Sequence, residues 1–336
     1  MAYTTIDDPS AYFKVQLYTG DGSTQAIAFD DTDTNMQPDF VWIKNRDAGD
    51  THLVFDSVRG VEKKLHISEH PEPNESTDDD TLTAFGSDGF TVGDDDKVNT
   101  NTEKYVAWCW KESATAGFDI VEFSGNSTNR TMSHSLSAIP HFYFVIAKGD
   151  DSRSNTYHRR NTDAPETDYL MMAYSNATTD NSDNWNDTAP TSSVFSLGTS
   201  NSVNDTGNNY MAYLFAPIQG YSHFGSYIGN GNADGTFVYT GFRPKYLLIK
   251  NQGASENWVI KDNARSTYNQ NIIHLAADVE DSEFSTTAVA VDILSNGFKI
   301  VTAGGTHING SGNTIVYMAF AEHPFGGDGV APATAR

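Results

Sequence analysis

The hydrophobic positions of this 336-residue chain gather in short continuous runs, and three of these runs are written alike. They are PDFVWIK at 38–44, PHFYFVIAK at 140–148 and PKYLLIK at 244–250. Each opens with a proline, continues with β-branched and aromatic residues, and closes with a lysine: Lys44, Lys148 or Lys250. This pattern predicts a strand covered on both faces. The proline fits the first position of a strand, where its missing N–H breaks no ladder bond.

The segments before and after these runs also recur. Alternating segments with a glycine at or near their end stand at 15–20, 118–126 and 224–231, and strongly aromatic segments stand at 105–110, 210–215 and 315–320. The spacing is roughly 105 residues, which is long for a solenoid repeat and typical of small tandem domains. Trp108, Tyr213 and Met318 occupy equivalent positions in the aromatic segments. The spacing between such equivalent positions changes from three residues to two along a segment, which does not fit simple in-and-out alternation, so we predict a bulge or burial on both faces of the strand.

Other shared signals predict turns and loops. An apolar residue precedes Asn99, Asn204 and Asn309, and we expect each asparagine to close a turn with its own side chain. An Asp followed three residues later by Arg, at 56–59 and again at 262–265, indicates a local ion pair. The polar stretches 69–80 and 178–187 are predicted as long exposed loops, and no sustained helical pattern is found.

Together these patterns predict an all-β protein of three tandem antiparallel β-sandwich-like repeats. The expected boundaries are an N-terminal arm at 1–14, β repeats at 15–113, 114–218 and 219–322, and a C-terminal arm at 323–336.

The charge balance narrows the partners. The chain has 21 basic and 44 acidic residues, a formal charge of -23, so it would repel a phosphate backbone and an anionic membrane surface. We therefore expect no nucleic-acid partner and no membrane insertion. The sequence opens with no charged-then-apolar leader and has no run of 18 apolar residues, so neither a signal peptide nor a membrane span is expected.

Candidate metal sites are weak. The segment 31–42 begins like a calcium loop, but Met36 replaces the required glycine and Trp42 the final glutamate. The carboxylate runs at 78–80 and 94–96 have no partner at a defined spacing, so solvated loops are favoured over calcium binding, which stays open. No metal ligand and no cofactor is predicted.

Signals for catalysis are also weak. The single cysteine, Cys109, excludes an intramolecular disulfide, and its aromatic strand predicts a buried thiol. No Gly-x-Ser-x-Gly motif is present, and His134 and His141, seven residues apart, do not have metal spacing. We predict no catalytic or cofactor-binding residues and no enzyme. The rival class is a glycan depolymerase, which needs only two well-placed carboxylates.

Two polar features are candidate contacts. The sequence has one compact basic group, formed by His158, Arg159 and Arg160. This group would either contact a carboxylate or phosphate of a partner or lie in a surface loop without a binding role, and we favour the surface loop. There are two hypotheses for the repeated lysines and asparagines: a ligand site common to the repeats, or a purely structural role. We favour the structural role.

Several longer phrases resemble a known group of proteins. IDDPSAYF at 6–13, GTFVYTGF at 235–242 and YMAFAEHP at 317–324 resemble a repeat-bearing, tail-fibre-like family of structural proteins from marine tailed bacteriophages. The resemblance covers nearly the whole chain, and the middle repeat diverges most.

The resemblance implies a virion structural protein, assembled in the host cytoplasm and exposed on the particle surface. We favour a tail-associated fibre or host-recognition module, with a capsid decoration protein as the alternative. The partners expected are other virion proteins of the tail or capsid, with a host surface glycan as a further candidate and a homo-oligomer or symmetric array as the assembly.

Overall fold

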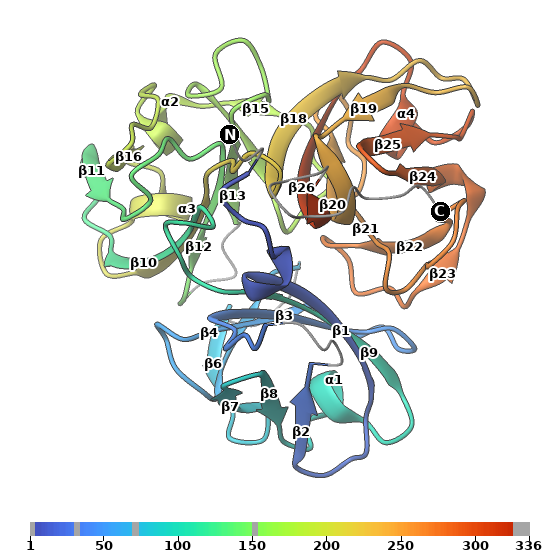
Figure 1. The fold of residues 1–336 in the computed structure, drawn as a ribbon. Helices are drawn as coiled ribbons and strands as arrows, with labels where there is room; N and C mark the ends of the chain where they lie inside the picture. The colour runs from blue at the N-terminus through green and yellow to red at the C-terminus, as the bar shows by residue number, and fades with distance from the viewer. Residues whose placement is uncertain (1–3, 30–33, 69–73, 150–153, 325–336) are drawn as a thin grey trace.

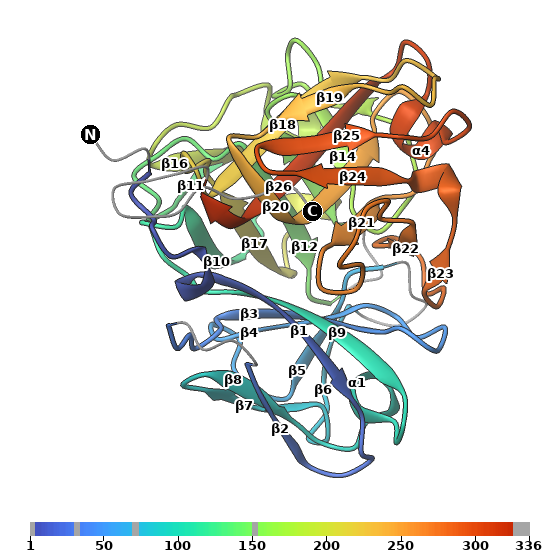
Figure 2. The ribbon, with the colours of Figure 1, turned by 45° about the vertical axis from the view of Figure 1, so that its right-hand side comes forward.

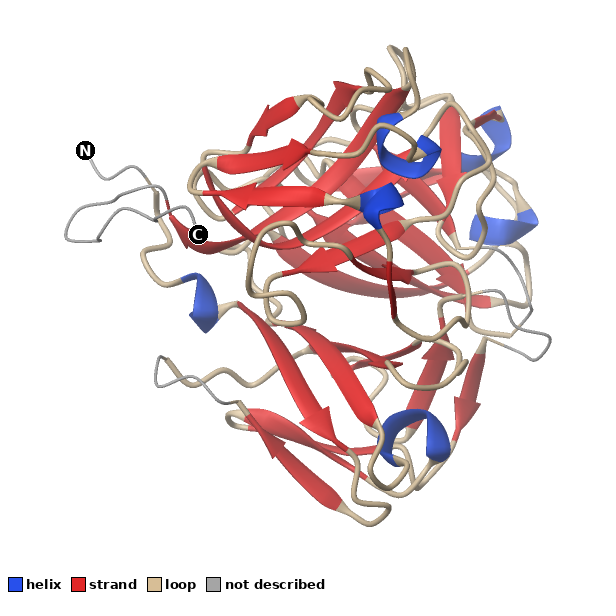
Figure 3. Cartoon of the chain, turned by 90° about the vertical axis from the view of Figure 1, so that its right-hand side faces the viewer, coloured by secondary structure: helices blue, strands red, loops and turns tan. Residues whose placement is uncertain are grey.

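The computed structural model describes residues 4–29, 34–68, 74–149 and 154–324. Over these residues the chain is built almost entirely from antiparallel strands, with a few short helices (Figure 3). Figure 1 shows three lobes around a common centre, which we call unit 1, unit 2 and unit 3 in chain order. The all-β prediction is therefore confirmed.

Each unit contains one six-stranded sheet. In unit 1 the strands, in sheet order, are β1 (Phe13–Thr19), β9 (Lys104–Trp110), β3 (Phe40–Asn45), β4 (Leu53–Asp56), β5 (Lys63–His66) and β6 (Glu75–Thr77). In unit 2 they are β10 (Phe118–Ser124), β17 (Asn209–Phe215), β12 (Phe142–Ala147), β13 (Asn155–His158), β14 (Asp168–Met171) and β15 (Thr179–Asp180). In unit 3 they are β18 (Ser222–Ile228), β26 (Thr314–Pro324), β20 (Phe242–Asn251), β21 (Val259–Asp262), β22 (Ile273–Ala276) and β23 (Phe284–Ser285).

A smaller sheet covers one face of each large sheet. In unit 1 it consists of β2 (Gln25–Ala28), β8 (Gly89–Val92) and β7 (Leu82–Gly86). In unit 2 it consists of β11 (Arg130–Ser133) and β16 (Val194–Leu197). In unit 3 it consists of β19 (Phe237–Tyr239), β25 (Gly297–Ile300) and β24 (Val291–Leu294). Figure 2 shows the small sheet of unit 1 on the side of the large sheet that faces away from the other two units.

The helices of the described chain are all short. They are α1 (Asp96–Asn99), α2 (Ser182–Trp185), α3 (Asn201–Asn204), α4 (Thr306–Asn309) and the 3-10 turns η1 (Pro9–Ala11) and η2 (Thr287–Val289). None of the helices described is long and apolar enough to cross a membrane.

The three large sheets share one strand order, so equivalent positions can be read from the pairing registers. Trp108, Tyr213 and Met318 stand opposite Trp42, Phe144 and Leu248, at the same place in each sheet. This is the arrangement that a triplicated module would give. Descent from one copied module and the boundaries placed at 113/114 and 218/219 stay predictions.

The core has four parts, which explains the continuous apolar runs. One central cluster takes residues from all three large sheets, among them Phe40, Phe142 and Phe320. The opposite face of each large sheet packs on its own small sheet in a separate cluster. Because both faces of a large sheet are covered, residues from Tyr105 to Trp110 are all buried, and the predicted burial on both sides is confirmed.

Aromatic rings fill the centre where the units meet. Phe13 lies 4.7 Å from Trp110 and 5.1 Å from Phe320 between ring centroids, and Phe40 lies 4.8 Å from Tyr213. The remaining space among these rings is about 10 Å³, no more than the roughly 10–15 Å³ that a single water needs, and only apolar atoms face it. The described units therefore meet in a dry packed core.

Three local expectations need correction. Pro244 lies inside β20 rather than at its start, and the strand accommodates it with a register shift on either side. The polar stretch 69–80 contains β6, and the stretch 178–187 contains β15 and α2. The described parts of these segments are polar because they form outer strands of the large sheets and a short helix, where few side chains reach an apolar core. Trp185 of α2 does reach one.

The chain ends are partly described. Ile6 is buried and the side chain of Asp8 accepts a hydrogen bond from the Ser10 amide to cap η1, so the segment expected as an arm is held by this chain itself. Strand β26 runs through residue 324. The rest of the expected C-terminal arm, 325–336, lies outside the described residues.

Candidate functional site

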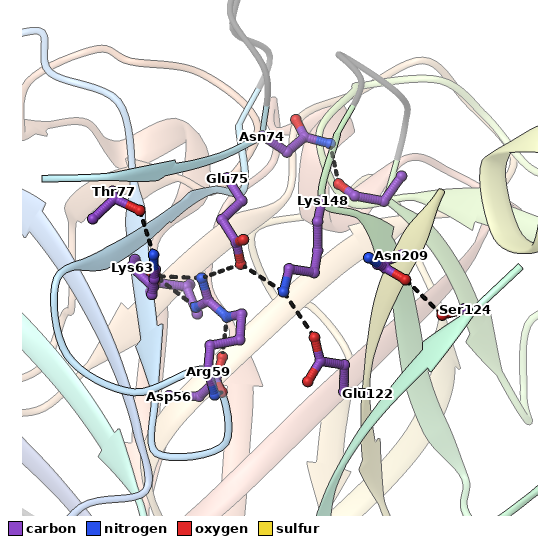
Figure 4. Close-up of polar contacts among 12 residues, drawn as sticks. Asp56, Arg59, Lys63, Asn74, Glu75, Thr77, Glu122, Ser124, Lys148 and Asn209 are labelled. Carbon is purple, nitrogen blue, oxygen red and sulfur yellow. Dashed lines mark hydrogen bonds and ion pairs between the residues drawn. The ribbon is translucent and has the colours of Figure 1, made fainter. Parts of the chain in front are cut away.

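The repeated lysines lie at the junctions between units. Figure 4 shows Lys148 of unit 2 between two carboxylates, with its Nζ 3.2 Å from Glu75 of unit 1 and 2.8 Å from Glu122 of its own unit. Burial lowers the pKa of Lys148, but the two carboxylates raise it more. Glu75 also lies 3.4 Å from the guanidinium of Arg59, so its carboxylate bridges Arg59 of unit 1 and Lys148 of unit 2.

Lys44 and Lys250 make the corresponding contacts with carbonyls instead. The Nζ of Lys44 donates to the carbonyl of Glu280 in unit 3 at 3.0 Å. The Nζ of Lys250 donates to the carbonyl of Ser175 in unit 2 at 3.0 Å. Burial lowers the pKa of each ammonium to about 8. The lysine of unit 1 contacts unit 3, that of unit 3 contacts unit 2, and that of unit 2 contacts unit 1. The repeated lysine therefore has the same structural role at each of the three junctions.

The predicted Asp–Arg contact is present in unit 1 and joins it to unit 2. Arg59 Nε lies 2.5 Å from Asp56 Oδ2, and both side chains are fully buried. The hydroxyl of Tyr213 in unit 2 donates to the same carboxylate oxygen at 2.7 Å.

The same contact in unit 3 joins it to unit 1. Arg265 Nε lies 2.6 Å from Asp262 Oδ2, and Trp108 of unit 1 donates its indole N–H to Asp262 Oδ2 at 3.1 Å. Tyr213 and Trp108 are equivalent positions, so both carboxylates receive a donor from the same place in the adjacent sheet.

A histidine replaces the aspartate in unit 2. His158 stands opposite Phe142, as Asp56 stands opposite Phe40. Its Nδ1 accepts the backbone N–H of Arg160 at 3.0 Å, so its Nε2 carries the proton and donates to the carbonyl of Tyr317 in unit 3 at 3.1 Å. The first residue of the basic group is thus a buried junction residue.

The repeated asparagines connect distant loops. Each is the last residue of a one-turn helix, and its side-chain amide donates to the carbonyl six or seven residues earlier and to a carbonyl more than 70 residues away. The residues are Asn99, Asn204 and Asn309. The first bond closes a local loop with the asparagine side chain, and the second, which was not expected, reaches the loop that follows the first strand of the unit.

One of the acidic clusters brings three carboxylates together. Asp78, Asp79 and Asp80 can bring one carboxylate oxygen each within 4.8 Å of one another, but Lys64 forms an ion pair with Asp78. The side chain of Asp95 accepts the N–H of Lys97 as the N-cap of α1. The calcium-like segment beginning at residue 31 lies in part outside the described residues.

Cys109 is buried within β9, and burial raises the pKa of its thiol. Its side chain packs in the core between the two sheets of unit 1. This agrees with the predicted buried position.

The best candidate for a binding site lies at the edge of unit 3, beside the end of the basic group. Two hollows adjoin there, of about 390 and 490 Å³, and His223 and Tyr239 line both. Arg160 of unit 2 lines the first hollow, and the side chains of Arg159 and Arg160 are exposed. We call these two hollows together the unit 3 groove.

Two exposed aromatic side chains stand on β19 at this groove. Phe237 is 46 % exposed and Tyr239 is 55 % exposed. They are two residues apart on a strand, so they project from the same face. Val238 between them is buried in the core of unit 3.

The other units show that the fold does not need these aromatics. The registers of the small sheets place Ala26 of unit 1 and Thr131 of unit 2 at the position of Phe237. They place Ala28 and Ser133 at the position of Tyr239. All four equivalents are small and exposed, so the two rings are an addition specific to unit 3.

The floor of the groove also differs from the other units. Gly225 stands opposite Tyr317 in unit 3, whereas units 1 and 2 pair Gln16 or Val121 with an alanine. A Cβ at Gly225 would lie 2.5 Å from the Tyr317 hydroxyl oxygen, so the glycine gives the ring its space.

Tyr317 and His223 form a hydrogen-bonded pair on this floor. The Tyr317 hydroxyl lies 2.8 Å from His223 Nδ1. Burial raises the pKa of Tyr317, and burial together with the charge of Arg160 lowers the pKa of His223. The two directions favour the neutral form of both groups, which share one hydrogen bond between the hydroxyl and Nδ1.

Sequence reasoning identified the basic group but missed the groove. Phe237, Tyr239 and Gly225 are visible in the sequence, but aromatics in strands are usually core residues, and only the registers show that these two face outward. The available signal was the difference between repeats: aromatics in unit 3 where the aligned segments of units 1 and 2 carry small residues.

The fold and the groove define a class: an all-β protein of three sheet units around a shared core, with an open hollow on one unit. Residues 8–324 match the family model of a domain of unknown function, DUF7483, and the chain belongs to this family. The comparison with curated proteins gives no match.

Proposed function

We propose that the protein is a structural component of a bacteriophage virion, exposed on the particle surface, and that it acts as a tail-associated host-recognition module. The observation that carries the binding role is the aromatic pair of the unit 3 groove, Phe237 and Tyr239. An exposed aromatic ring leaves apolar surface in contact with water. The fold does not require these rings, because the equivalent positions of units 1 and 2 carry small residues.

The architecture is compatible with this role. The described chain has a packed shared core and ion pairs that join its units, which suit a compact knob-like piece that presents a fixed surface. Virion placement itself rests on the sequence resemblance to the tail-fibre-like family.

The test combines position and binding. Gold-labelled antibodies against the protein are expected to mark the tail tip of intact virions. Pre-incubation of host cells with the purified full chain is expected to reduce phage adsorption in a dose-dependent manner.

Each opposing outcome points to another function. Labelling over the head would favour a capsid decoration protein. Shortening of the host polysaccharide by the purified chain would instead indicate a depolymerase.

A further inference from the structure

We propose that the unit 3 groove binds a glycan that carries isolated carboxylate groups, with Phe237 and Tyr239 stacking on sugar rings and Arg160 pairing with the carboxylate. This inference rests on the proposed host-recognition role and names the class of ligand.

The first step is the unusual state of Arg160. In a chain of 21 basic and 44 acidic residues, the buried arginines Arg59 and Arg265 are ion-paired. Arg160 is exposed, and among the described residues no carboxylate forms an ion pair with it. An arginine fork presents a pair of parallel N–H donors, which is the geometry that a carboxylate accepts.

The second step is the distribution of acidic side chains around Arg160. The two hollows of the groove have no carboxylate in their lining. Arg160 also borders two further hollows, one lined by unit 2 alone and one between units 2 and 3, and Asp163 lines both of these while Glu166 lines the first. An anionic ligand is therefore favoured in the two hollows of the groove and opposed in the two hollows that Asp163 lines.

The third step is the aromatic platform. Neighbouring positions i and i+2 of a strand lie about 6.6 Å apart, so Phe237 and Tyr239 can present faces to successive rings of a chain-like ligand. Flat apolar faces with nearby hydrogen-bonding groups suit a sugar ring, which has apolar C–H faces and polar hydroxyl edges.

Those polar groups are present on the groove floor. His223 lines both hollows, and the hydrogen bond of its Nδ1 to the Tyr317 hydroxyl leaves Nε2 as the ring nitrogen for a ligand. Ser226 is exposed and lines the first hollow. A ring nitrogen and a serine hydroxyl can each form a hydrogen bond with a sugar hydroxyl, which both donates and accepts.

The net charge selects among anionic ligands. A formal charge of -23 repels a dense polyanion such as a nucleic acid over distances comparable to the Debye length. A glycan with one carboxylate among several neutral rings brings few charges, and its carboxylate can be placed at the one unpaired arginine of the groove. This favours a sparsely charged glycan over a nucleic acid.

The experiment uses matched ligands and the full chain. The purified protein is applied to a printed panel of uronate- and sialate-bearing oligosaccharides, each beside its carboxyl-reduced neutral form, and affinities of positive pairs are measured in solution. We expect the acidic form to bind at least tenfold more tightly than the reduced form.

Two kinds of variant assign the roles. Arg160→Ala is expected to abolish the preference for the acidic form while weak binding of the neutral form persists. Phe237→Ala and Tyr239→Ala are expected to lower binding of both forms at least tenfold, and both variants should fold because alanine occupies these positions in unit 1.

Two controls are matched to them. Arg159→Ala removes the neighbouring exposed arginine, which lines a hollow on the unit 2 side. Tyr268→Ala removes a ring that is 78 % exposed elsewhere in unit 3. Both are expected to bind like the unaltered chain.

The outcomes separate this inference from the proposed function. Equal binding of acidic and reduced forms would overturn the role of Arg160, and no binding across the panel would overturn the ligand class. If the chain blocks phage adsorption but Phe237→Ala and Tyr239→Ala block it equally well, recognition takes place at another surface and the groove assignment fails. Failure of the unaltered chain to bind host cells would count against the proposed function itself.

Discussion

His158 shows how one residue links a junction to a hollow. Its ring accepts the backbone N–H of Arg160 on one side and donates to the carbonyl of Tyr317 on the other. The contact with Arg160 requires the neutral ring, because a protonated Nδ1 cannot accept a hydrogen bond. Burial lowers the pKa of His158 to about 4, with further lowering by the neighbouring His141, His223 and Arg160.

This pKa predicts a loss of stability in acid. The unfolded chain takes up the proton near pH 6.5 and the folded chain only near pH 4, so between these values the unfolded state binds more protons. The contribution is fully present above pH 6.5 and declines as the pH falls toward 4, by up to about 3 kcal/mol. Urea unfolding measured at intervals over this range should show the decline.

A variant isolates the residue from the other titrating groups. His158→Gln should unfold with a shallower pH dependence between 6.5 and 4 than the unaltered chain. His323→Gln, at an exposed position of β26, should keep the full dependence. Identical slopes for the unaltered chain and His158→Gln would contradict the assignment.

At the scale of elements, strands β18 and β26 of unit 3 depend on one exchanged pair. Gly225 and Tyr317 stand where unit 2 has Val121 and Ala212. The ring of Tyr317 occupies the space that a side chain at 225 would need, so the two positions should be energetically coupled.

A double-mutant cycle tests this coupling. Gly225→Val should destabilise the protein by about 1–3 kcal/mol because the Tyr317 ring must move. Combining it with Tyr317→Ala, which reproduces the pair of unit 2, should cost less than the sum of the two single changes. Unfolding free energies from denaturant titration provide the measurement, and strictly additive values would show that the two side chains do not compete for space.

The strands differ in how far the sequence predicts them. The positions of β3, β12 and β20, the burial of β9 on both faces and the Asp56–Arg59 contact all follow from local patterns of apolar, aromatic and charged residues. The outer strands β6 and β15 were missed because their polar, partly exposed side chains leave no hydrophobic alternation. The groove was missed because outward orientation of Phe237 depends on its register with Lys299, a pairing between residues far apart in the chain.

At the scale of the whole molecule, each large sheet uses the other two units as part of its core. The inner face of unit 2 includes Phe142, Phe144 and Phe215, all buried in the central cluster. Removing the neighbouring units would expose this aromatic face to water, which opposes folding.

An isolated unit is therefore expected not to fold. A fragment spanning 114–218 should lack the near-ultraviolet circular dichroism and the cooperative thermal unfolding of the full chain. A fragment with a dispersed NMR spectrum and a sharp thermal transition would show instead that the central cluster is dispensable for the unit.

Because the three units belong to one chain, they can carry different side chains, and this affects the number of grooves per molecule. In a ring of identical subunits, a substitution at one position alters all three faces at once, and a groove would appear in triplicate. Here Ala26, Thr131 and Phe237 occupy one structural position with three different side chains, so each molecule offers a single groove. Any gain in avidity at a cell surface must then come from several molecules held side by side, and not from the pseudo-symmetry within one.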